Sequence, residues 1–135
     1  MTPSKACPVV LRHVSGVTQI LAFKHPLAGL QLVKGSIESG ETPAEAALRE
    51  LAEESGITHA HISRSLGTWA SDHENQIWWL GLIQATSSLP SEWEHTTPDG
   101  GGLIFRFFWQ PLHAALGQEW HPVYQRAIAH IRAAA

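Results

Sequence analysis

The sequence has a single cysteine, Cys7, and no set of cysteine and histidine residues with the spacing of a zinc site. One cysteine cannot form an internal disulfide, which excludes a disulfide-stabilised scaffold and is typical of a protein of the reducing cytoplasm. We therefore expect a cytoplasmic protein, and any metal that it binds should have oxygen ligands.

Long hydrophobic runs are also absent. No apolar segment approaches the roughly 20 residues that a membrane-spanning helix requires, and no apolar signal-peptide core is visible near the N-terminus. The sequence thus predicts no membrane partner.

Basic residues are few, with nine Lys and Arg against twelve Asp and Glu and a formal net charge of −3. They form no cluster, which argues against tight binding of duplex nucleic acid and favours a small anionic partner bridged by metal. The 135 residues are 44% hydrophobic and contain no internal repeat, so we expect a single globular domain over residues 1–135. The oligomeric state is not indicated.

A helix is predicted from Thr42 to Gly56. Thr42 and Glu45 have the spacing of a capping box, Pro43 suits the first helical position, and Gly56 suits the C-terminal end. Apolar residues recur at the i, i+3, i+4, i+7 spacing of a core-facing stripe, and they are Ala44, Ala47, Leu48 and Leu51.

The opposite face of this helix carries Glu50, Glu53 and Glu54 within an arc of about 100°. Glu50 and Glu54 are a like-charged i,i+4 pair, and the last helical turn disfavours acids, at a cost of about 0.3 to 1 kcal/mol for each fault. Magnesium or manganese would reverse the sign of these interactions, so the pattern predicts a metal site rather than a solvated acidic surface. Arg49 lies one i,i+4 step from Glu53 and is expected to orient its carboxylate.

Residues 35–57 read GSIESGETPAEAALRELAEESGI. This segment resembles the Nudix box, G-x5-E-x7-R-E-U-x-E-E-x-G-U with U apolar, and the match is complete. An accidental match is expected on the order of once in 10^8 start positions. The matching residues are Gly35, Glu41, Arg49, Glu50, Leu51, Glu53, Glu54, Gly56 and Ile57. The chain is thus identified from its sequence as a member of the Nudix hydrolase family.

The resemblance implies an α/β/α sandwich with a mixed central sheet. It also implies a pyrophosphohydrolase that cleaves a nucleoside diphosphate derivative with magnesium or manganese. The implied metal ligands are the carboxylates of Glu50, Glu53 and Glu54 and the carbonyl of Gly35, and the implied supporting residues are Glu41 and Arg49. Family members differ in their general base, so both Glu50 and an acid from a later loop are candidates for that role. The number of metals is not specified either.

The box does not specify the group beyond the diphosphate. We see no marker of the NADH, coenzyme A, dinucleoside polyphosphate or ADP-ribose subgroups, which leaves a nucleoside triphosphate, including an oxidised or non-standard one, as the favoured substrate. Dinucleoside polyphosphates, ADP-ribose and nucleotide sugars stay as alternatives. A non-catalytic nucleotide-binding sensor is the alternative of another class, although an intact box favours the enzyme.

Three further residues are predicted substrate contacts. Lys34 and Arg106 suit phosphate groups, and Trp93 suits stacking on a base, although surface lysine and arginine residues are equally well explained as solvated. The segment 87–102, predicted to be a long loop, contains acids of the kind that bind an additional metal or act as base in some family members. They are Glu92, Glu94 and Asp99, of which Glu94 is favoured.

The remaining patterns predict several strands and two more helices. Strands are expected at 8–13, 17–23, 30–33, 62–71, 76–85 and 103–109, and helices at 111–116 and 123–134. The first two strands should form a hairpin at Ser15-Gly16. Trp78 and Trp79 must point to opposite faces of their strand.

Overall fold

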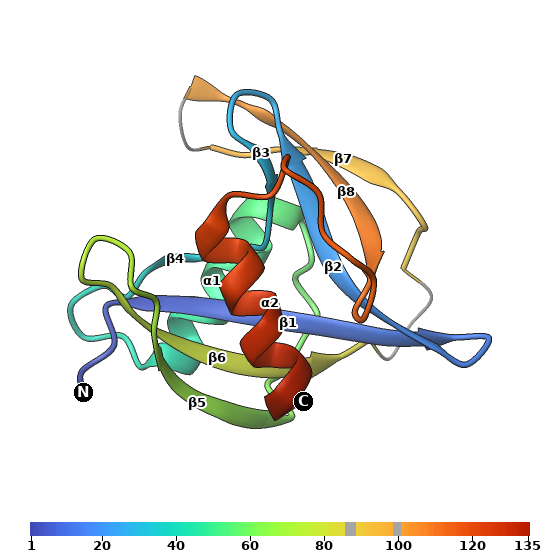
Figure 1. Ribbon diagram of the computed structural model, residues 1–135. Coiled ribbons are helices and arrows are strands. Elements are labelled where there is room, and N and C mark those ends of the chain that lie inside the picture. Colours follow the sequence, from blue (N-terminus) through green and yellow to red (C-terminus); the bar gives the residue numbers. More distant parts are fainter. Residues whose placement is uncertain (86–88, 99–100) are drawn as a thin grey trace.

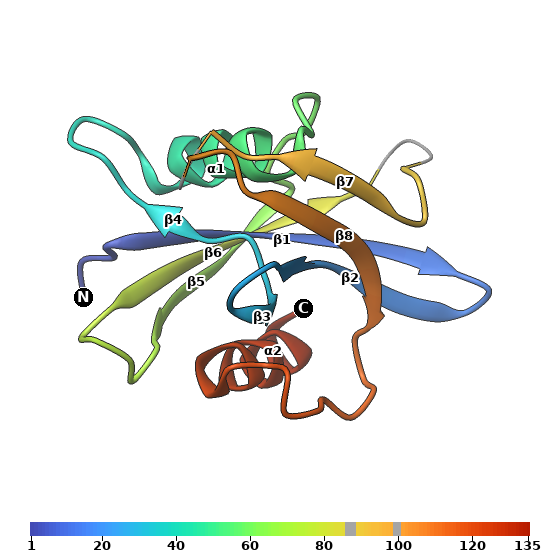
Figure 2. The same cartoon turned by 90° about the horizontal axis from the view of Figure 1, so that it is seen from above.

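The computed structural model describes residues 1–85, 89–98 and 101–135. Its strands form one mixed sheet that lies between two helices, α1 (Pro43–Ser55) and α2 (Pro122–Ala134), as Figures 1 and 2 show. The strands are β1 (Lys5–Val14), β2 (Val17–His25), β3 (Gly29–Gln31), β4 (Gly35–Ser36), β5 (Arg64–Ala70), β6 (Ile77–Gln84), β7 (Trp93–Thr96) and β8 (Ile104–Pro111). The predicted α/β/α sandwich is confirmed.

The long strand β1 lies at the centre of the sheet and joins its two halves. The strand order is β5-β6-β1-β2-β8-β7, with β3 paired to β2 and β4 paired to β1. β1 and β2 form the predicted antiparallel hairpin, closed by Val14 opposite Val17, whereas β1 and β6 run parallel. Because β4 pairs with the start of β1, the first residues of the Nudix box are fixed to the middle of the sheet.

The core forms two apolar layers, one on each face of the sheet. Ile128 and Ile131 of α2 pack over one face, where they meet Trp78, and Leu51 of α1 packs over the other, together with Phe107. Trp79, the neighbour of Trp78 in the sequence, packs on the α1 side against Ala46 and Ala47. The two tryptophans therefore lie on opposite faces, as predicted. No helix within the described ranges is long and apolar enough to span a membrane.

The prediction of a helix at 111–116 is wrong. Pro111 is the last residue of β8, and turns follow it. The backbone N–H of Leu112 donates to the carbonyl of Thr18 at 2.9 Å, and Arg132 of α2 donates to the carbonyls of Leu112 and Ala114. These long-range hydrogen bonds hold the segment outside a helix.

The prediction of a long loop at 87–102 is also wrong in part, because this segment contains β7. This strand pairs antiparallel with β8, with Trp93 opposite Phe107 and Thr96 opposite Ile104. Asp99 lies outside the described residues. Other differences concern boundaries, since the strand expected at 30–33 is Gly29–Gln31 and is followed by the very short β4.

Candidate functional site

Both ends of helix α1 are set by local chemistry. The N–H of Glu45 donates to the hydroxyl of Thr42 at 3.1 Å, and the N–H of Thr42 donates to the carboxylate of Glu45 at 2.8 Å. At the other end Gly56 has the left-handed φ of 81° that ends a helix, and its N–H donates to the carbonyl of Ala52 at 3.0 Å. The predicted helix is confirmed, so the directions of its acidic side chains are fixed.

The acidic face of α1 is covered to a greater extent than the sequence indicated. Glu50 and Glu54 are only 8% and 7% exposed, while the side chain of Glu53 is 34% exposed. Strands β1 and β4 lie against α1, which places the first two carboxylates inside the molecule instead of on its surface. Burying carboxylates is unfavourable unless cations or hydrogen bonds compensate.

Gly35 of β4 leaves the space that Glu50 fills. A Cβ atom at position 35 would lie 1.9 Å from the carboxyl carbon of Glu50 and 2.2 Å from its Oε1. No side chain can occupy that position without moving the carboxylate. The first glycine of the box is therefore required by close packing, and it brings a backbone segment directly against an acidic side chain.

Arg49 joins three acidic side chains to the backbone of β4. Its Nε and Nη2 donate to both oxygens of Glu41 at 2.7 and 2.9 Å, and its Nη1 donates to Glu50 at 2.9 Å and to Glu53 at 3.4 Å. Nη2 also donates to the carbonyl of Ser36 at 2.9 Å. The predicted contact with Glu53 is present, but it is longer than the contacts with Glu41 and Glu50.

These hydrogen bonds change the acidity of the partners. The hydrogen bonds from Arg49, followed by one from the N–H of Glu38, lower the pKa of Glu41 from its ordinary 4.5 to about 2. The same partner, Glu41, is the main cause that raises the pKa of Arg49 above its usual value. Both groups therefore stay charged across the whole physiological range.

The oxygen donors of this cluster match the chemistry of a hard divalent cation. Glu50, Glu53 and Glu54 could supply carboxylates, and the carbonyl of Gly35 could supply a neutral oxygen. Within the described part of the chain, no three His, Cys, Asp or Glu side chains already converge as a metal cluster. Like charges repel and Arg49 draws Glu50 and Glu53 toward itself, which accounts for the open arrangement.

Lys34 lies just before the box in a partly buried position. Its Nζ is 3.4 Å from the side-chain oxygen of Gln76 and 4.9 Å from the centre of the Trp78 ring. Burial, followed by repulsion from Lys5, lowers the pKa of Lys34, and the charge of Glu54 acts in the opposite direction. Lys34 is thus a partly desolvated cation just before the box.

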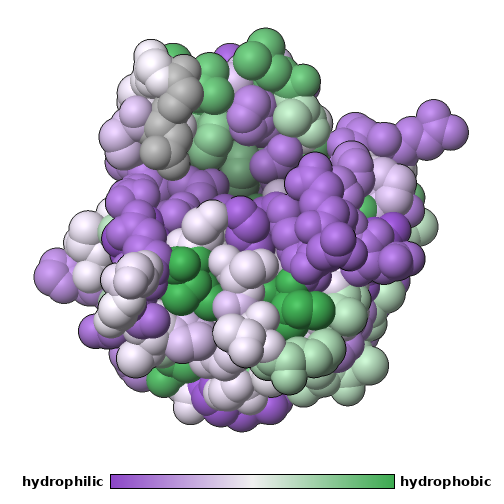
Figure 3. All heavy atoms as spheres, turned by 90° about the vertical axis from the view of Figure 1, so that its left-hand side faces the viewer, coloured by the Kyte–Doolittle hydropathy of each residue, from purple (hydrophilic) through white to green (hydrophobic). Residues whose placement is uncertain are grey.

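A hollow of about 190 Å³ adjoins Lys34. Its lining comprises Ala28, Gln31, Lys34, His73, His121, Val123 and Tyr124. Figure 3 shows one face of the molecule, across which hydrophilic side chains gather in a broad band. A hollow bordered by a lysine and two histidines suits an anionic ligand.

The structure pairs two of the predicted residues with each other. Arg106 on β8 lies opposite Glu94 on β7, and its Nε donates to the Glu94 carboxylate at 3.0 Å. Both side chains are exposed, and together with Lys24 and Phe108 they line a hollow of about 430 Å³. The predicted phosphate contact and the predicted additional acid thus form a cross-strand ion pair.

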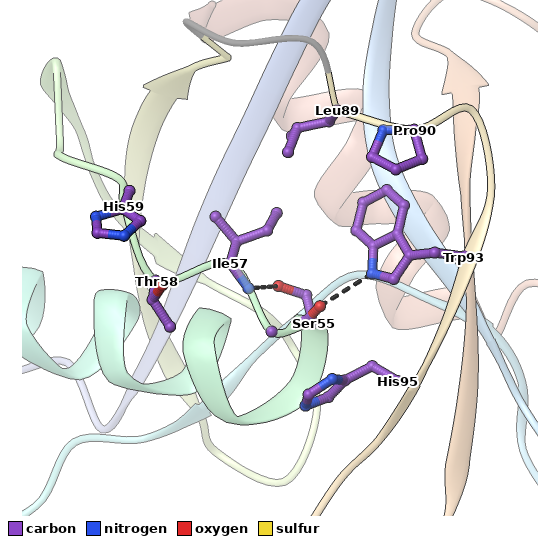
Figure 4. Close-up of a pocket in the computed structure, with 9 residues that line it drawn as sticks. Ser55, Ile57, Thr58, His59, Leu89, Pro90, Trp93 and His95 are labelled. Atoms are coloured by element: carbon purple, nitrogen blue, oxygen red, sulfur yellow. Dashed lines mark hydrogen bonds between the residues drawn. The ribbon is translucent and has the colours of Figure 1, made fainter.

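Trp93 lies on strand β7 and not in a loop. Its ring stacks on Phe107 with a centroid distance of 5.2 Å and an angle of 11°, and its Nε1–H donates to the carbonyl of Ser55 at 2.9 Å. Trp93 also lines a hollow of about 490 Å³ beyond the C-terminal end of α1, shown in Figure 4. One face of the ring is therefore occupied by Phe107.

Sequence reasoning missed His95. Its Nε2 lies 3.1 Å from the carbonyl of Glu53. In the sequence His95 is one of nine histidines within a polar segment. The only available signal was the alternation of Trp93 and His95, which places both on one face of a strand if that segment is extended.

The family model described as NUDIX domain matches residues 6–131. The chain therefore belongs to the Nudix family, and the fold and box described above agree with this assignment. Within this family, the chain is similar to the 8-oxo-dGTP diphosphatase of Escherichia coli strain K12, with 35% identity over 85 residues. It is also similar to the RNA pyrophosphohydrolase of Vibrio vulnificus strain YJ016, with 27% identity over 116 residues.

These alignments cover only part of each protein. They span 57% and 73% of this chain, and 66% and 67% of the respective relatives. Among solved structures, a Nudix hydrolase from Mycobacterium smegmatis, RenU, has a TM-score of 0.65 at 17% identity, covering 97% of this chain and 84% of that one. The Caenorhabditis elegans Ap4A hydrolase has a TM-score of 0.61 at 20% identity, with coverages of 98% and 95%.

The structural neighbours establish the fold alone, since their identities are low. The names of the relatives agree with the predicted class of reaction, which is hydrolysis of a pyrophosphate linkage in a nucleotide derivative. The prediction of the family made from residues 35–57 is confirmed.

Proposed function

We propose that this chain is a pyrophosphohydrolase that uses a divalent cation, magnesium or manganese, to cleave a nucleoside triphosphate between phosphate groups. The observation that carries the proposal is the arrangement of Gly35, Arg49 and Glu50. Gly35 admits the carboxylate of Glu50 against β4, and Arg49 holds one of its oxygens at 2.9 Å. A solvated acidic helix would need neither contact.

In the proposed site Glu50, Glu53 and Glu54, with the carbonyl of Gly35, hold the cation. The bound cation supplies neutralisation of charge on the pyrophosphate oxygens and lowers the pKa of a coordinated water. Arg49 keeps the carboxylates of Glu50 and Glu53 in fixed orientations, and Glu41 keeps Arg49 in place. The protein thus contributes positioning, on which phosphate transfer mainly depends.

The remaining roles are phosphate binding, proton abstraction and binding of the rest of the substrate. Lys34 borders a hollow that is also lined by Gln31, His73 and His121, so it is suited to bind a phosphate oxygen. We assign the general base to Glu50, because it lies on α1 with the other proposed metal ligands, whereas Glu94 lies on β7. The ion pair between Glu94 and Arg106, together with Trp93, borders the hollow of about 430 Å³, which would take the part of the substrate beyond the phosphates.

The favoured substrate is an oxidised nucleoside triphosphate, with 8-oxo-dGTP as the first compound to test. The relative from Escherichia coli is named for that compound, and no subgroup marker in the sequence favours another class. The relatives from Vibrio make a 5′-triphosphorylated RNA the second compound.

The decisive experiment measures phosphate and pyrophosphate release with magnesium. The panel contains 8-oxo-dGTP, the ordinary nucleoside triphosphates, a 5′-triphosphorylated RNA oligonucleotide, ADP-ribose, a dinucleoside polyphosphate and a nucleotide sugar. Wild type is compared with Glu53→Gln, and Glu119→Gln serves as the control because Glu119 is an exposed acid before α2.

We expect metal-dependent turnover of one class that Glu53→Gln loses by at least about 100-fold and that Glu119→Gln retains. Binding of a nucleotide by wild type without turnover anywhere on the panel would overturn the hydrolase proposal and support a sensor. Equal turnover in wild type and Glu53→Gln would contradict the assigned metal site.

A further inference from the structure

The last turn of α1 carries two of the proposed metal ligands, Glu53 and Glu54. The last carbonyl groups of a helix have no partner within the helix, so a helix end is its least constrained part. In α1 the carbonyl of Ala52 accepts from Gly56, which is the usual cap. The carbonyls of Glu53 and Ser55 are bonded from outside the helix, by side chains of β7.

His95 supplies the first of these two bonds. Its Nε2 lies 3.1 Å from the carbonyl oxygen of Glu53, and because a carbonyl only accepts, Nε2 must carry the proton. A Cβ atom at Gly56 would lie 2.9 Å from Nδ1 of the same ring. Gly56 therefore provides both the left-handed turn and the room for His95 against the helix end.

Trp93 supplies the second bond, from Nε1 to the carbonyl of Ser55 at 2.9 Å. The residue is itself held by its stacking on Phe107 and by the pairing of β7 with β8. Figure 4 shows Trp93 and His95 on β7 facing the C-terminal end of the helix. Both donors thus come from a strand that the sheet fixes.

We infer that His95 and Trp93 are positioning residues, which fix the last turn of α1 so that Glu53 and Glu54 face the bound cation. The inference rests on the proposed metal site but not on the identity of the substrate. It also gives β7 a role, because His95 and Trp93 of this strand both donate to the last turn of α1, which carries the proposed metal ligands.

If His95 and Trp93 served only the stability of α1, their loss would leave the affinity for the cation unchanged. The capping box, the apolar stripe and the contacts with β1 hold the rest of α1, so loss of one hydrogen bond at its end leaves the helix folded. Loss of order in the last turn should instead weaken cation binding. Partners that orient metal ligands typically contribute a factor of about 10 to 100 in metal affinity.

The test compares His95→Leu, which removes the donor, with His95→Gln, whose amide nitrogen can replace Nε2. The first readout is the dissociation constant of Mn²⁺, measured by electron paramagnetic resonance without any substrate. We expect His95→Leu to weaken Mn²⁺ binding by about 10-fold and His95→Gln to restore it to within about threefold. Trp93→Phe, which keeps the stacking ring but loses the N–H, should give a smaller loss.

Mn²⁺ binding by His95→Leu equal to that of wild type would overturn the inference, as would equal weakening in both His95 variants. If His95→Leu does not fold, nitrogen chemical shifts of wild-type His95 remain decisive. The Nε2–H tautomer supports the inference, and the Nδ1–H tautomer overturns it. Because these readouts need no turnover, they separate this inference from the hydrolase proposal, which the substrate panel tests.

Discussion

The carboxyl carbon of Glu50 lies only 1.9 Å from the position that a Cβ atom on Gly35 would occupy. The two residues are 15 positions apart in the sequence and belong to β4 and α1. Their contact exists because β4 pairs with the start of β1, against which α1 packs. The glycine thus places an acidic side chain by leaving space for it.

Gly35→Ala should therefore inactivate the enzyme without unfolding it. The added methyl group must displace the Glu50 carboxylate, and a displacement of about 1 Å in a catalytic group costs on the order of 100-fold in rate. Overpacking of this kind costs about 1 to 3 kcal/mol in the free energy of unfolding. Steady-state kinetics and thermal unfolding of Gly35→Ala and of the neighbouring control Ser36→Ala check this, and full activity in Gly35→Ala would contradict it.

Arg49→Gln should raise the pKa of Glu41 toward its ordinary value. The hydrogen bonds from Arg49 are the first cause of the lowered pKa of Glu41, about 2 in place of 4.5. Because the folded pKa is the lower one, this pairing contributes its full stability above about pH 4.5 and loses it as the pH falls toward 2. In Arg49→Gln that part of the pH dependence should vanish.

Carbon NMR of the Glu41 carboxyl group tests the Arg49→Gln prediction directly. The titration midpoint should rise from about 2 in wild type toward 4.5 in the variant, and it should stop short of that value because the N–H of Glu38 still donates to Glu41. Arg64→Gln, at an exposed arginine on β5, should leave the midpoint of Glu41 unchanged. A Glu41 midpoint near 4.5 in wild type would show that the two hydrogen bonds from Arg49 to Glu41 do not form in solution.

Helix α1 could be predicted from its first to its last residue because its determinants are local. The capping box, the proline and the terminal glycine all lie within the segment that they control, and the apolar stripe needs only the helical period. The contact between Arg49 and Glu53 was predictable for the same reason. The stronger contact between Arg49 and Glu41 was not, since it depends on the path of the loop that precedes the helix.

Strand β7 could not be predicted because its determinants are not local. Its four residues, Trp93 to Thr96, contain two apolar or β-branched positions and two polar ones, and the strand exists through pairing with β8. The roles of Trp93 and His95 depend on that pairing, so they were hidden as well. The prediction of a helix at 111–116 failed for the same reason, because the hydrogen bonds from Arg132 to the carbonyl of Leu112 and from the N–H of Leu112 to the carbonyl of Thr18 override local preference.

Thr42→Ala should destabilise the protein by about 1 kcal/mol, within a range of 0.5 to 2. The substitution removes the acceptor for the N–H of Glu45, one of the otherwise unpaired donors at the start of α1. Chemical denaturation measures the change, and Thr42→Ser should restore most of the loss because serine keeps the hydroxyl. A loss as large in Thr42→Ser as in Thr42→Ala would mean that the hydroxyl is not the stabilising group.

Cys7 should be inert toward thiol reagents in the native protein. It is completely buried in the middle of the sheet, and burial is the main cause that raises its thiol pKa to about 12. Only the thiolate reacts, so at pH 8 both access and ionisation are lacking. Labelling with a chromogenic disulfide should proceed only after guanidinium is added, and rapid labelling of the folded protein would disprove this burial.

Magnesium should stabilise wild type strongly and Glu54→Gln only weakly. A ligand that binds the folded state alone adds about 2.7 kcal/mol at 100 times its dissociation constant, which corresponds to a rise in melting temperature on the order of 10 °C for a domain of this size. Glu54 is buried in the last turn of α1, where the helix dipole and the like charge of Glu50 disfavour a carboxylate until a cation is bound. Glutamine keeps the shape and removes the charge, so most of the magnesium-induced rise should disappear, whereas the exposed control Glu119→Gln should keep it. Melting curves with EDTA and with saturating magnesium measure all three proteins, and an equal rise in Glu54→Gln would exclude this carboxylate as a metal ligand.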